Sequence, residues 1–220
     1  MSSNLFKLQN VSFSYAGGKA VLKDISLEIN RNDLVIINGE SGSGKSTFLK
    51  LFNRFSDSIE GEILFHDRGL KEYGIERIRS SVIYLPQLPF MIDGTVEDNL
   101  SFPFSFHAHK EQEFNPRKAG EWFDYFQLDI PFDHDALKLS IGQKQRIALI
   151  RSMLLEPEVL LLDEPGSALD SNNKKLIEKK IESLINSSEV TVIMATHSDV
   201  SFSDTDVRFF GLEEGRLNGQ

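Results

Sequence analysis

The sequence predicts an α/β fold in which a core of parallel strands carries a helical lobe inserted between two of them. Continuous apolar runs at 34–37, 160–162 and 190–195 are typical of buried parallel strands. Residues from about 88 to 156 instead show helical periodicity, clustered aromatic side chains and few strand candidates. We therefore expect one domain over 1–220, with a core formed by 1–87 and 157–220 and a helical subdomain at about 88–156.

The other elements follow from apolar alternation and turn residues. Segments 5–13 and 22–29 predict two strands separated by a glycine turn at 16–18. Residues 46–55 have helical character, whereas 62–65, 82–85, 207–212 and a short piece near Arg216 predict further strands. An amphipathic helix is expected over 144–155. The aromatic side chains of the lobe are expected to form mostly its hydrophobic core, and they are Phe102, Phe104, Phe106, Phe114, Trp122, Phe123, Tyr125 and Phe126.

Composition excludes several classes of protein. The net charge of −9 argues against a broad basic surface, so no nucleic-acid partner is expected. The absence of cysteine excludes disulfides, thiolate metal sites and cysteine nucleophiles. No run reaches the roughly 18 apolar residues of a membrane span, and residues 1–7 do not resemble a secretory signal. We expect a cytoplasmic protein that meets a membrane only through a partner.

A glycine-rich loop follows the strand at 34–37. Its pattern, Gly-x-x-x-x-Gly-Lys-Ser, is typical of loops that bind the phosphates of a nucleoside triphosphate. Its glycines let backbone N–H groups surround phosphate oxygens, its lysine reaches the β- and γ-phosphates, and its serine hydroxyl ligates Mg²⁺. The alternative is a flexible serine-glycine turn, which the flanking strand and helix disfavour. The residues are Gly39, Glu40, Ser41, Gly42, Ser43, Gly44, Lys45, Ser46 and Thr47.

Polar residues follow three more predicted strands. Asp163 ends an apolar strand, where it would hold Mg²⁺, and Glu164 is suited to polarise an attacking water. His197 and Gln87 follow strands that should end at the same sheet edge, where ligands gather. Each has a plain structural alternative, and for Tyr15 an ordinary strand aromatic is as well supported as a ring stacked on adenine.

A second motif lies at 139–146. Ser140 and Gln143 have the spacing of a capping box at the start of a helix. Its free N–H groups also suit a phosphate anion. The motif alone does not decide between a well-capped core helix and a phosphate site.

Together these motifs resemble those of the ATP-binding cassette (ABC) ATPases, and the resemblance covers nearly the whole chain. In order they match the aromatic A-loop (Tyr15), Walker A (39–47), Q-loop (Gln87), signature (139–143), Walker B (159–163), catalytic glutamate (Glu164), D-loop (167–170) and switch histidine (His197). The signature has Ile141 at its usual first glycine, and Gly166 replaces a common threonine. The fold implied is a P-loop NTPase core of ABC type with an antiparallel β subdomain and an inserted helical subdomain.

The resemblance also implies cofactors and partners. ATP and Mg²⁺ would be held by the loop, with Ser46, Gln87 and Asp163 at the metal and with Glu164, His197 and Lys45 in catalytic roles. Two copies would form a homodimer through an ATP sandwich, in which Ser140, Gly142, Gln143 and Asp170 face the partner's nucleotide. A permease on a separate chain would hold the protein peripherally on the inner face of the cell membrane.

The transported substrate is less constrained. Residues 94–103 and 146–151 are similar to those of a bacterial iron-export cassette, which suggests metal export. A soluble non-transport ABC ATPase, such as an iron–sulfur assembly factor, is the alternative. A small-molecule phosphotransferase is disfavoured, because it would not need the signature, the D-loop and the switch histidine together.

Overall fold

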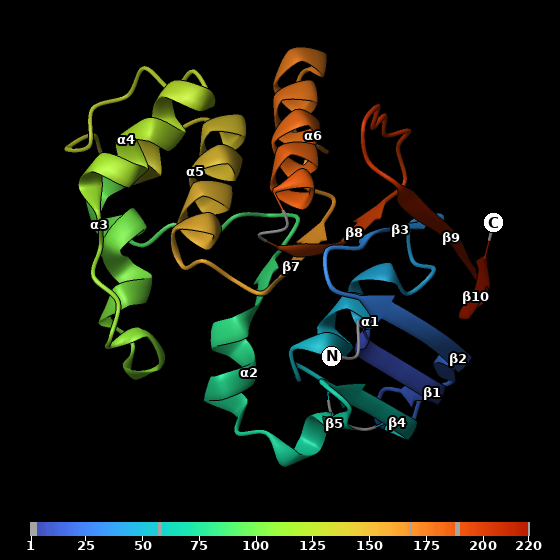
Figure 1. Cartoon of the computed structure of the whole chain (residues 1–220). Coiled ribbons are helices and arrows are strands. Elements are labelled where there is room, and N and C mark those ends of the chain that lie inside the picture. The colour runs from blue at the N-terminus through green and yellow to red at the C-terminus, as the bar shows by residue number, and fades with distance from the viewer. Residues whose placement is uncertain (1–3, 57–58, 168, 188–189, 220) are drawn as a thin grey trace.

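The computed structural model describes residues 4–56, 59–167, 169–187 and 190–219 (Figure 1). Residues 1–3 of the N-terminal segment and position 168 of the 167–170 segment, both used in the sequence predictions, lie outside these ranges. Within them the chain forms two sheets and a set of helices, so the α/β fold is confirmed.

The smaller sheet is antiparallel and has the order β2-β1-β4-β5. Its strands are β1 (Asn4–Ser14), β2 (Ala20–Asn30), β4 (Ile59–Phe65) and β5 (Arg68–Gly69). Alternating apolar residues predicted the first three. The two-residue β5 was not predicted; it pairs with β4 through a turn in which His66 and Asp67 both have positive φ (50° and 59°), the geometry of tight hairpin turns.

The larger sheet has the order β10-β9-β3-β8-β7-β6. Five neighbouring strands are parallel, and only β10 runs antiparallel to its neighbour. The strands are β3 (Leu34–Asn38), β6 (Val82–Leu85), β7 (Val159–Asp163), β8 (Thr191–Thr196), β9 (Val207–Glu213) and β10 (Arg216–Gly219). Each contains or borders a segment predicted from its apolar run.

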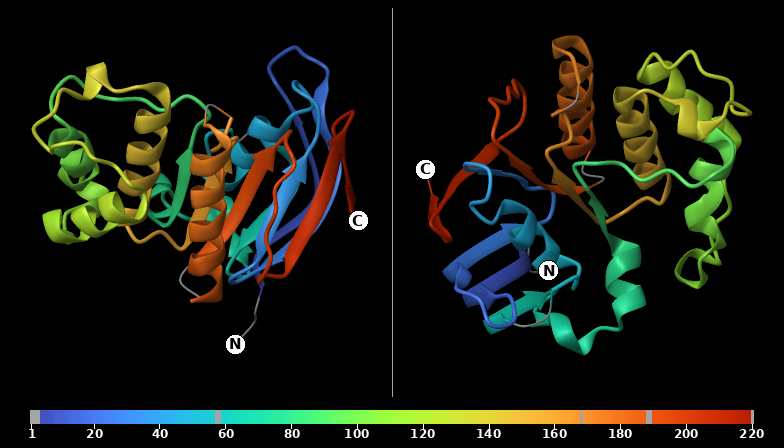
Figure 2. Two further views of the ribbon diagram at one scale, coloured as in Figure 1. Left: turned by 90° about the horizontal axis from the view of Figure 1, so that it is seen from above. Right: turned by 180° about the vertical axis from the view of Figure 1, so that it is seen from behind.

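Successive side chains of the central strands point to opposite faces of the sheet, and each face carries its own hydrophobic core. On one face, Leu34 and Ile36 of β3 pack with the helices α4 (Pro116–Tyr125), α5 (Ile141–Leu154) and α6 (Ser171–Asn186). On the other face, Val35 and Ile37 pack with α1 (Lys45–Phe52) and the antiparallel sheet. Figure 2 shows the six-stranded sheet between these layers. Residues buried on both faces explain why these strands read as unbroken apolar runs.

The helices are α1 (Lys45–Phe52), α2 (Ile75–Ser81), α3 (Val96–Ser101), α4 (Pro116–Tyr125), α5 (Ile141–Leu154) and α6 (Ser171–Asn186). Helix α1 is shorter than the predicted 46–55, since Arg54 just beyond it has a positive φ of 56°. A helix was correctly predicted over most of 144–155, but the prediction that it is amphipathic was wrong. Helix α5 is buried on nearly all sides over its second half, because it lies between α3, α4 and the sheet.

Helices α3, α4 and α5 gather at one end of the large sheet, away from the antiparallel sheet (Figure 1). Most of their aromatic side chains pack in the core, with Trp122, Phe123 and Phe126 buried. Phe102 and Phe106 are 37% and 50% exposed, and their rings meet edge to face.

Candidate nucleotide site

Four parallel strands end at the same edge of the large sheet, and each delivers predicted site residues there. The loop 39–47 follows β3, Gln87 follows β6, Asp163 and Glu164 end β7, and His197 follows β8. Parallel strands with this arrangement bind ligands at their carboxyl ends. The tertiary structure therefore gathers residues that are up to about 160 positions apart in the sequence.

The glycine loop has a backbone that side chains would hinder. Gly42 and Gly44 have φ values of +86° and +107°, in the left-handed region that favours glycine. A Cβ on Gly39 would lie 2.5 Å from the Leu212 carbonyl oxygen, so the chain passes too closely there for any other residue. The loop borders a cavity of about 800 Å³ that is also lined by His197 and residues 212–214.

The polar groups of this loop suit a phosphate. Lys45 is buried, and its ammonium donates hydrogen bonds to the carbonyls of Gly39 (2.6 Å) and Glu40 (2.9 Å). The Ser43 hydroxyl oxygen is buried without a hydrogen-bond partner among the described residues. Gly44 is the N-cap of α1, and no side chain caps the first N–H groups of this helix. A bound anion would satisfy these donors.

Glu164 lies at the meeting point of three of these segments. It is 9% exposed and adopts a positive φ of 50°, and its N–H donates to the Ala195 carbonyl of β8 at 2.9 Å. Its Oε2 is 2.8 Å from His197 Nδ1 and accepts a 3.1 Å hydrogen bond from Gln87 Nε2. Its Oε1 is 3.8 Å from Lys45 Nζ. The carboxylate is thus fixed by groups from three strand ends.

Asp163 has a partner that sequence reasoning missed. The Tyr84 hydroxyl of β6 donates a 2.7 Å hydrogen bond to Asp163 Oδ2. Burial, followed by this hydrogen bond, raises the pKa of Tyr84 above its usual value, so the phenol stays protonated. The one signal in the sequence is that Tyr84 belongs to the strand predicted at 82–85, three residues before Gln87.

The donor set near the loop fits Mg²⁺. Asp163 is buried and its Oδ2 accepts the hydrogen bond from Tyr84, while Ser46 lies half-buried in the first turn of α1. Hard oxygen ligands of this kind, few in number, are typical of Mg²⁺ sites completed by substrate phosphates. Gln87 is exposed and its amide nitrogen points at Glu164, which leaves its amide oxygen as a further ligand.

Tyr15 lies beside the loop without lining its cavity. Its ring is 52% exposed and packs edge-on against Phe13, and its hydroxyl is 3.0 Å from Thr47 Oγ1. It lines instead a second cavity of about 610 Å³, together with Lys50, Tyr84 and Phe90. Stacking of the Tyr15 ring on adenine stays a prediction.

Residues of the second motif lie apart from the loop within one chain. Ser140 caps α5 through Gln143, and both hydrogen bonds of the predicted capping box are present. None of residues 139–146 lines the cavity at the glycine loop. Gly142 lies in the first turn of α5 and Ser140 is exposed.

Asp170 has a similar place at the start of α6. Its carboxylate accepts hydrogen bonds from the Asn172 and Asn173 N–H groups, which lower its pKa. The nearby Gly166 leaves space for another residue of α6, since an added Cβ would lie 3.1 Å from Lys174 Cγ. Lys174 in turn donates a hydrogen bond to the Asp199 carbonyl. The glycine at position 166, where a threonine is common, therefore leaves room for the side chain that connects α6 to the segment after His197.

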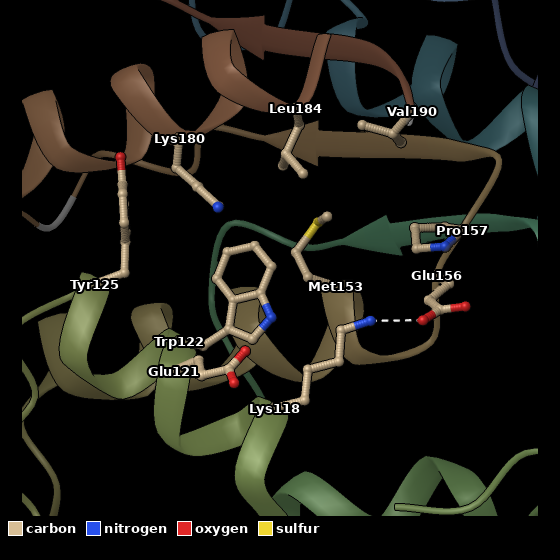
Figure 3. A pocket seen from close by; sticks show the side chains of 10 residues that line it. All are labelled: Lys118, Glu121, Trp122, Tyr125, Met153, Glu156, Pro157, Lys180, Leu184 and Val190. Carbon is tan, nitrogen blue, oxygen red and sulfur yellow. Dashed lines mark hydrogen bonds and ion pairs between the residues drawn. The ribbon is translucent and has the colours of Figure 1, made fainter. Parts of the chain in front are cut away.

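A third cavity, of about 530 Å³, lies between α4, the end of α5 and α6, away from the strand ends (Figure 3). The Lys180 ammonium lies 4.4 Å from the ring centre of Trp122 and 4.8 Å from that of Tyr125. Lys118 and Glu156 form an ion pair across its rim. None of the predicted site residues lines this cavity.

None of the helices in the described part of the chain is long and apolar enough to cross a bilayer.

A family model described as ABC transporter matches residues 22–167. Two curated relatives are similar over nearly the whole chain. The lactococcin-G-processing and transport ATP-binding protein LagD of Lactococcus lactis subsp. lactis is 36% identical over 230 residues, which are 100% of this chain but only 32% of that protein. The probable iron export ATP-binding protein FetA of Escherichia coli (strain K12) is 33% identical over 206 residues, 93% of this chain and 90% of FetA.

Among solved structures, that of CbiO1 from Clostridium perfringens, described as part of the ABC transporter complex CbiONQ, has a TM-score of 0.82 and 27% identity. The match covers 98% of this chain and 87% of that one. Since this chain spans about a third of LagD but nearly all of FetA, its relatives include both longer proteins and proteins of similar length.

Proposed function

The chain belongs to the ABC transporter family of ATPases, and from that premise we propose that it binds and hydrolyses ATP to drive transport through a separate membrane subunit. The observation that carries this proposal is the position of Glu164. Its carboxylate lies beside the phosphate-loop lysine and is held by Gln87 and His197.

ATP would bind with its phosphates in the cradle at 39–47. The Lys45 ammonium, now on two carbonyls of the loop, would turn to the β- and γ-phosphates, and the Ser43 hydroxyl and the first N–H groups of α1 would donate to their oxygens. Ser46, Asp163 and Gln87 would hold Mg²⁺. When bound, this ion would neutralise charge on the phosphates as the bond to the γ-phosphate breaks.

Glu164 would act as the general base for hydrolysis. A water placed between its carboxylate and the γ-phosphate would lose a proton to Glu164 as its oxygen attacks phosphorus and the β–γ bridging bond breaks. His197 and Gln87 bind the same Oε2, which orients the other carboxylate oxygen. His197 would also contact the γ-phosphate, because it lines the loop cavity.

Two copies of the chain would be needed for a complete site. Ser140, Gly142 and Gln143 form an exposed or half-exposed helix start that does not line the chain's own loop cavity. We propose that this helix start and Asp170 cover the nucleotide of a second copy in an ATP-bound homodimer. Ile141 is 58% exposed and would lie in the same interface.

The membrane subunit would dock on the cavity beside β6, which we call the docking groove. It is defined by Tyr15, Lys50, Phe55, Tyr84, Phe90 and Arg151. Phe55 and Phe90 are 53% and 67% exposed, and the neighbouring Leu88 is 76% exposed. Such a run of exposed apolar side chains is typical of a protein interface. The chain would thereby lie on the cytoplasmic face of the membrane.

We propose iron export as the transport process, since FetA aligns over most of both chains. The helical subdomain would comprise residues from about 88 to 156, and it would carry Phe90 and Arg151 of the docking groove as well as the signature. Metal content and metal tolerance of a deletion strain would test the proposed substrate. Unchanged values in both assays would contradict it.

The substitution Glu164→Gln tests the catalytic proposal. We expect ATP binding to persist, turnover to fall by about 10² to 10⁴-fold, and an ATP-dependent dimer to accumulate in gel filtration. Glu60→Gln, at an exposed position of β4, is the matched control and should behave as wild type. A Glu164→Gln protein that hydrolyses ATP rapidly as a monomer would refute the assignment.

Co-purification tests the membrane subunit. A tagged chain extracted from membranes in mild detergent should retain an integral membrane protein, and Phe90→Asp should release it without changing ATP affinity. Full activity with no membrane partner in either preparation would favour the soluble non-transport class instead.

A further inference from the structure

The Tyr84 side chain spans the distance between the docking groove and the metal-site carboxylate. In the parallel register of β6 and β7, Tyr84 pairs with Leu161, so Asp163, two residues further on, points to the same face of the sheet. The Tyr84 hydroxyl reaches Asp163 Oδ2 at 2.7 Å. This bond holds one of the two oxygens of the Asp163 carboxylate.

The ring of Tyr84 lies among the residues of the docking groove. It meets the Phe55 ring edge to face at 5.9 Å between centroids, and the Lys50 ammonium lies 5.9 Å from its centre. Phe55 in turn lies under the Arg79 guanidinium at 4.3 Å. One side chain therefore has an apolar surface at the groove and a polar end on a buried carboxylate.

The two parts cannot move independently, because a tyrosine ring and its hydroxyl are one rigid group. A group that enters the groove and displaces Phe55 would change the packing of the Tyr84 ring, and a shift of the ring would lengthen or bend its hydrogen bond. A hydrogen bond weakens steeply when its geometry departs from linearity. Occupancy of the groove would thereby alter the orientation of Asp163.

We propose that Tyr84 is a positioning residue that holds the Asp163 carboxylate for the metal–nucleotide complex and transmits the state of the docking groove to it. This inference rests on the proposed function, since it takes Asp163 as a metal ligand and the groove as the site of the membrane subunit. The connection consists of one side chain, whose ring lies in the groove and whose hydroxyl binds the carboxylate.

The first experiment measures metal binding directly. Tyr84→Phe keeps the ring and removes the hydroxyl. In the presence of ADP, the dissociation constant for Mn²⁺, measured from the free-ion signal in electron paramagnetic resonance, should rise on the order of tenfold, as for other residues that orient metal ligands. ADP affinity in excess EDTA should not change. Tyr73→Phe is the matched control, since Tyr73 is also half-buried and its hydroxyl donates to a backbone carbonyl, that of Phe65, at 2.9 Å.

The outcomes separate this inference from the proposed function. If Tyr84→Phe binds Mn²⁺ as tightly as wild type, the positioning role is overturned while the ATPase assignment stands. If the wild-type chain binds no Mn²⁺ with ADP, and Asp163→Asn makes no difference, the metal site and this inference both fail. Thermal unfolding of every variant would confirm that each one is folded.

A double-mutant cycle tests transmission from the groove. Phe55→Ala changes a groove residue that packs on the Tyr84 ring. It should weaken Mn²⁺ binding several-fold in the wild-type background and have no further effect in Tyr84→Phe, because the connection is then already broken. Equal effects in both backgrounds would overturn the transmission.

Discussion

His197 and Glu164 form a direct contact across the ends of β8 and β7, with His197 Nδ1 at 2.8 Å from Glu164 Oε2. The histidine side chain is 47% exposed and the glutamate 10% exposed, so a buried carboxylate is held by a residue at the cavity surface. This contact connects the base proposed for hydrolysis to the wall of the nucleotide cavity.

Removing the histidine should therefore slow hydrolysis without preventing nucleotide binding. For His197→Ala we expect the turnover rate to fall on the order of 10²-fold, because the carboxylate loses one of its orienting partners. The Kd for ATP, measured by fluorescence titration, should stay within a few-fold of wild type. His134→Ala, which removes an exposed histidine that does not line the loop cavity, is the control. A variant that loses ATP binding and turnover together would contradict the role.

Ser140 offers a way to separate helix capping from phosphate contact. Ser140→Ala should lower the free energy of unfolding by about 1 kcal/mol, because an N-cap is lost. Ser140→Asp should retain that stability, since aspartate is an equally good N-cap. If the partner's phosphates lie at this helix start, the aspartate charge should still abolish ATP-dependent dimers in light scattering. Normal dimers formed by Ser140→Asp would leave only the structural role.

Lys180 connects α6 to α4 through the rings of Trp122 and Tyr125 (Figure 3). Lys180→Met keeps much of the aliphatic stem and removes the charge. Urea unfolding should show a loss of about 0.5–1 kcal/mol, the usual size of a partly exposed cation–π interaction. Lys179→Met, one position away and exposed, should cost nothing measurable. Equal stability of the two variants would show that the contact contributes nothing.

Glu178 should make the stability of the fold depend on pH. It is buried in α6, which raises its pKa above the ordinary value of 4.5, although the nearby charge of Lys174 opposes the shift. A carboxyl group with a raised pKa in the folded state contributes stability that is present below pH 4.5 and is lost as pH rises through the folded pKa.

In Glu178→Gln this loss should disappear. The variant's free energy of unfolding, measured by urea denaturation from pH 4.5 to 7.5, should increase relative to wild type as pH rises. Glu62→Gln, on an exposed strand position, should keep a constant difference. A pH-independent difference for Glu178→Gln would show that burial does not perturb this group.

Local sequence patterns determined most of the elements and several of the motifs. The strand at 34–37 and the glycine loop are predictable because buried strands and left-handed glycines each leave a local signature in composition and spacing. The capping box at Ser140 and Gln143 is local for the same reason, since both of its hydrogen bonds join residues three apart. Helices α2 and α6 and the two-residue β5 were not predicted. The segments of α2 and β5 have too few residues to show a period.

Only the tertiary structure decided which side chains meet. The Tyr84–Asp163 hydrogen bond joins residues 79 positions apart, and it exists because β6 lies beside β7 in a particular register. The burial of α5 on nearly all sides likewise depends on what packs around it and not on its own pattern. The sequence by itself determined the chemical groups of a nucleotide site; their distances, and the link from the groove to Asp163, follow from strand pairing and packing.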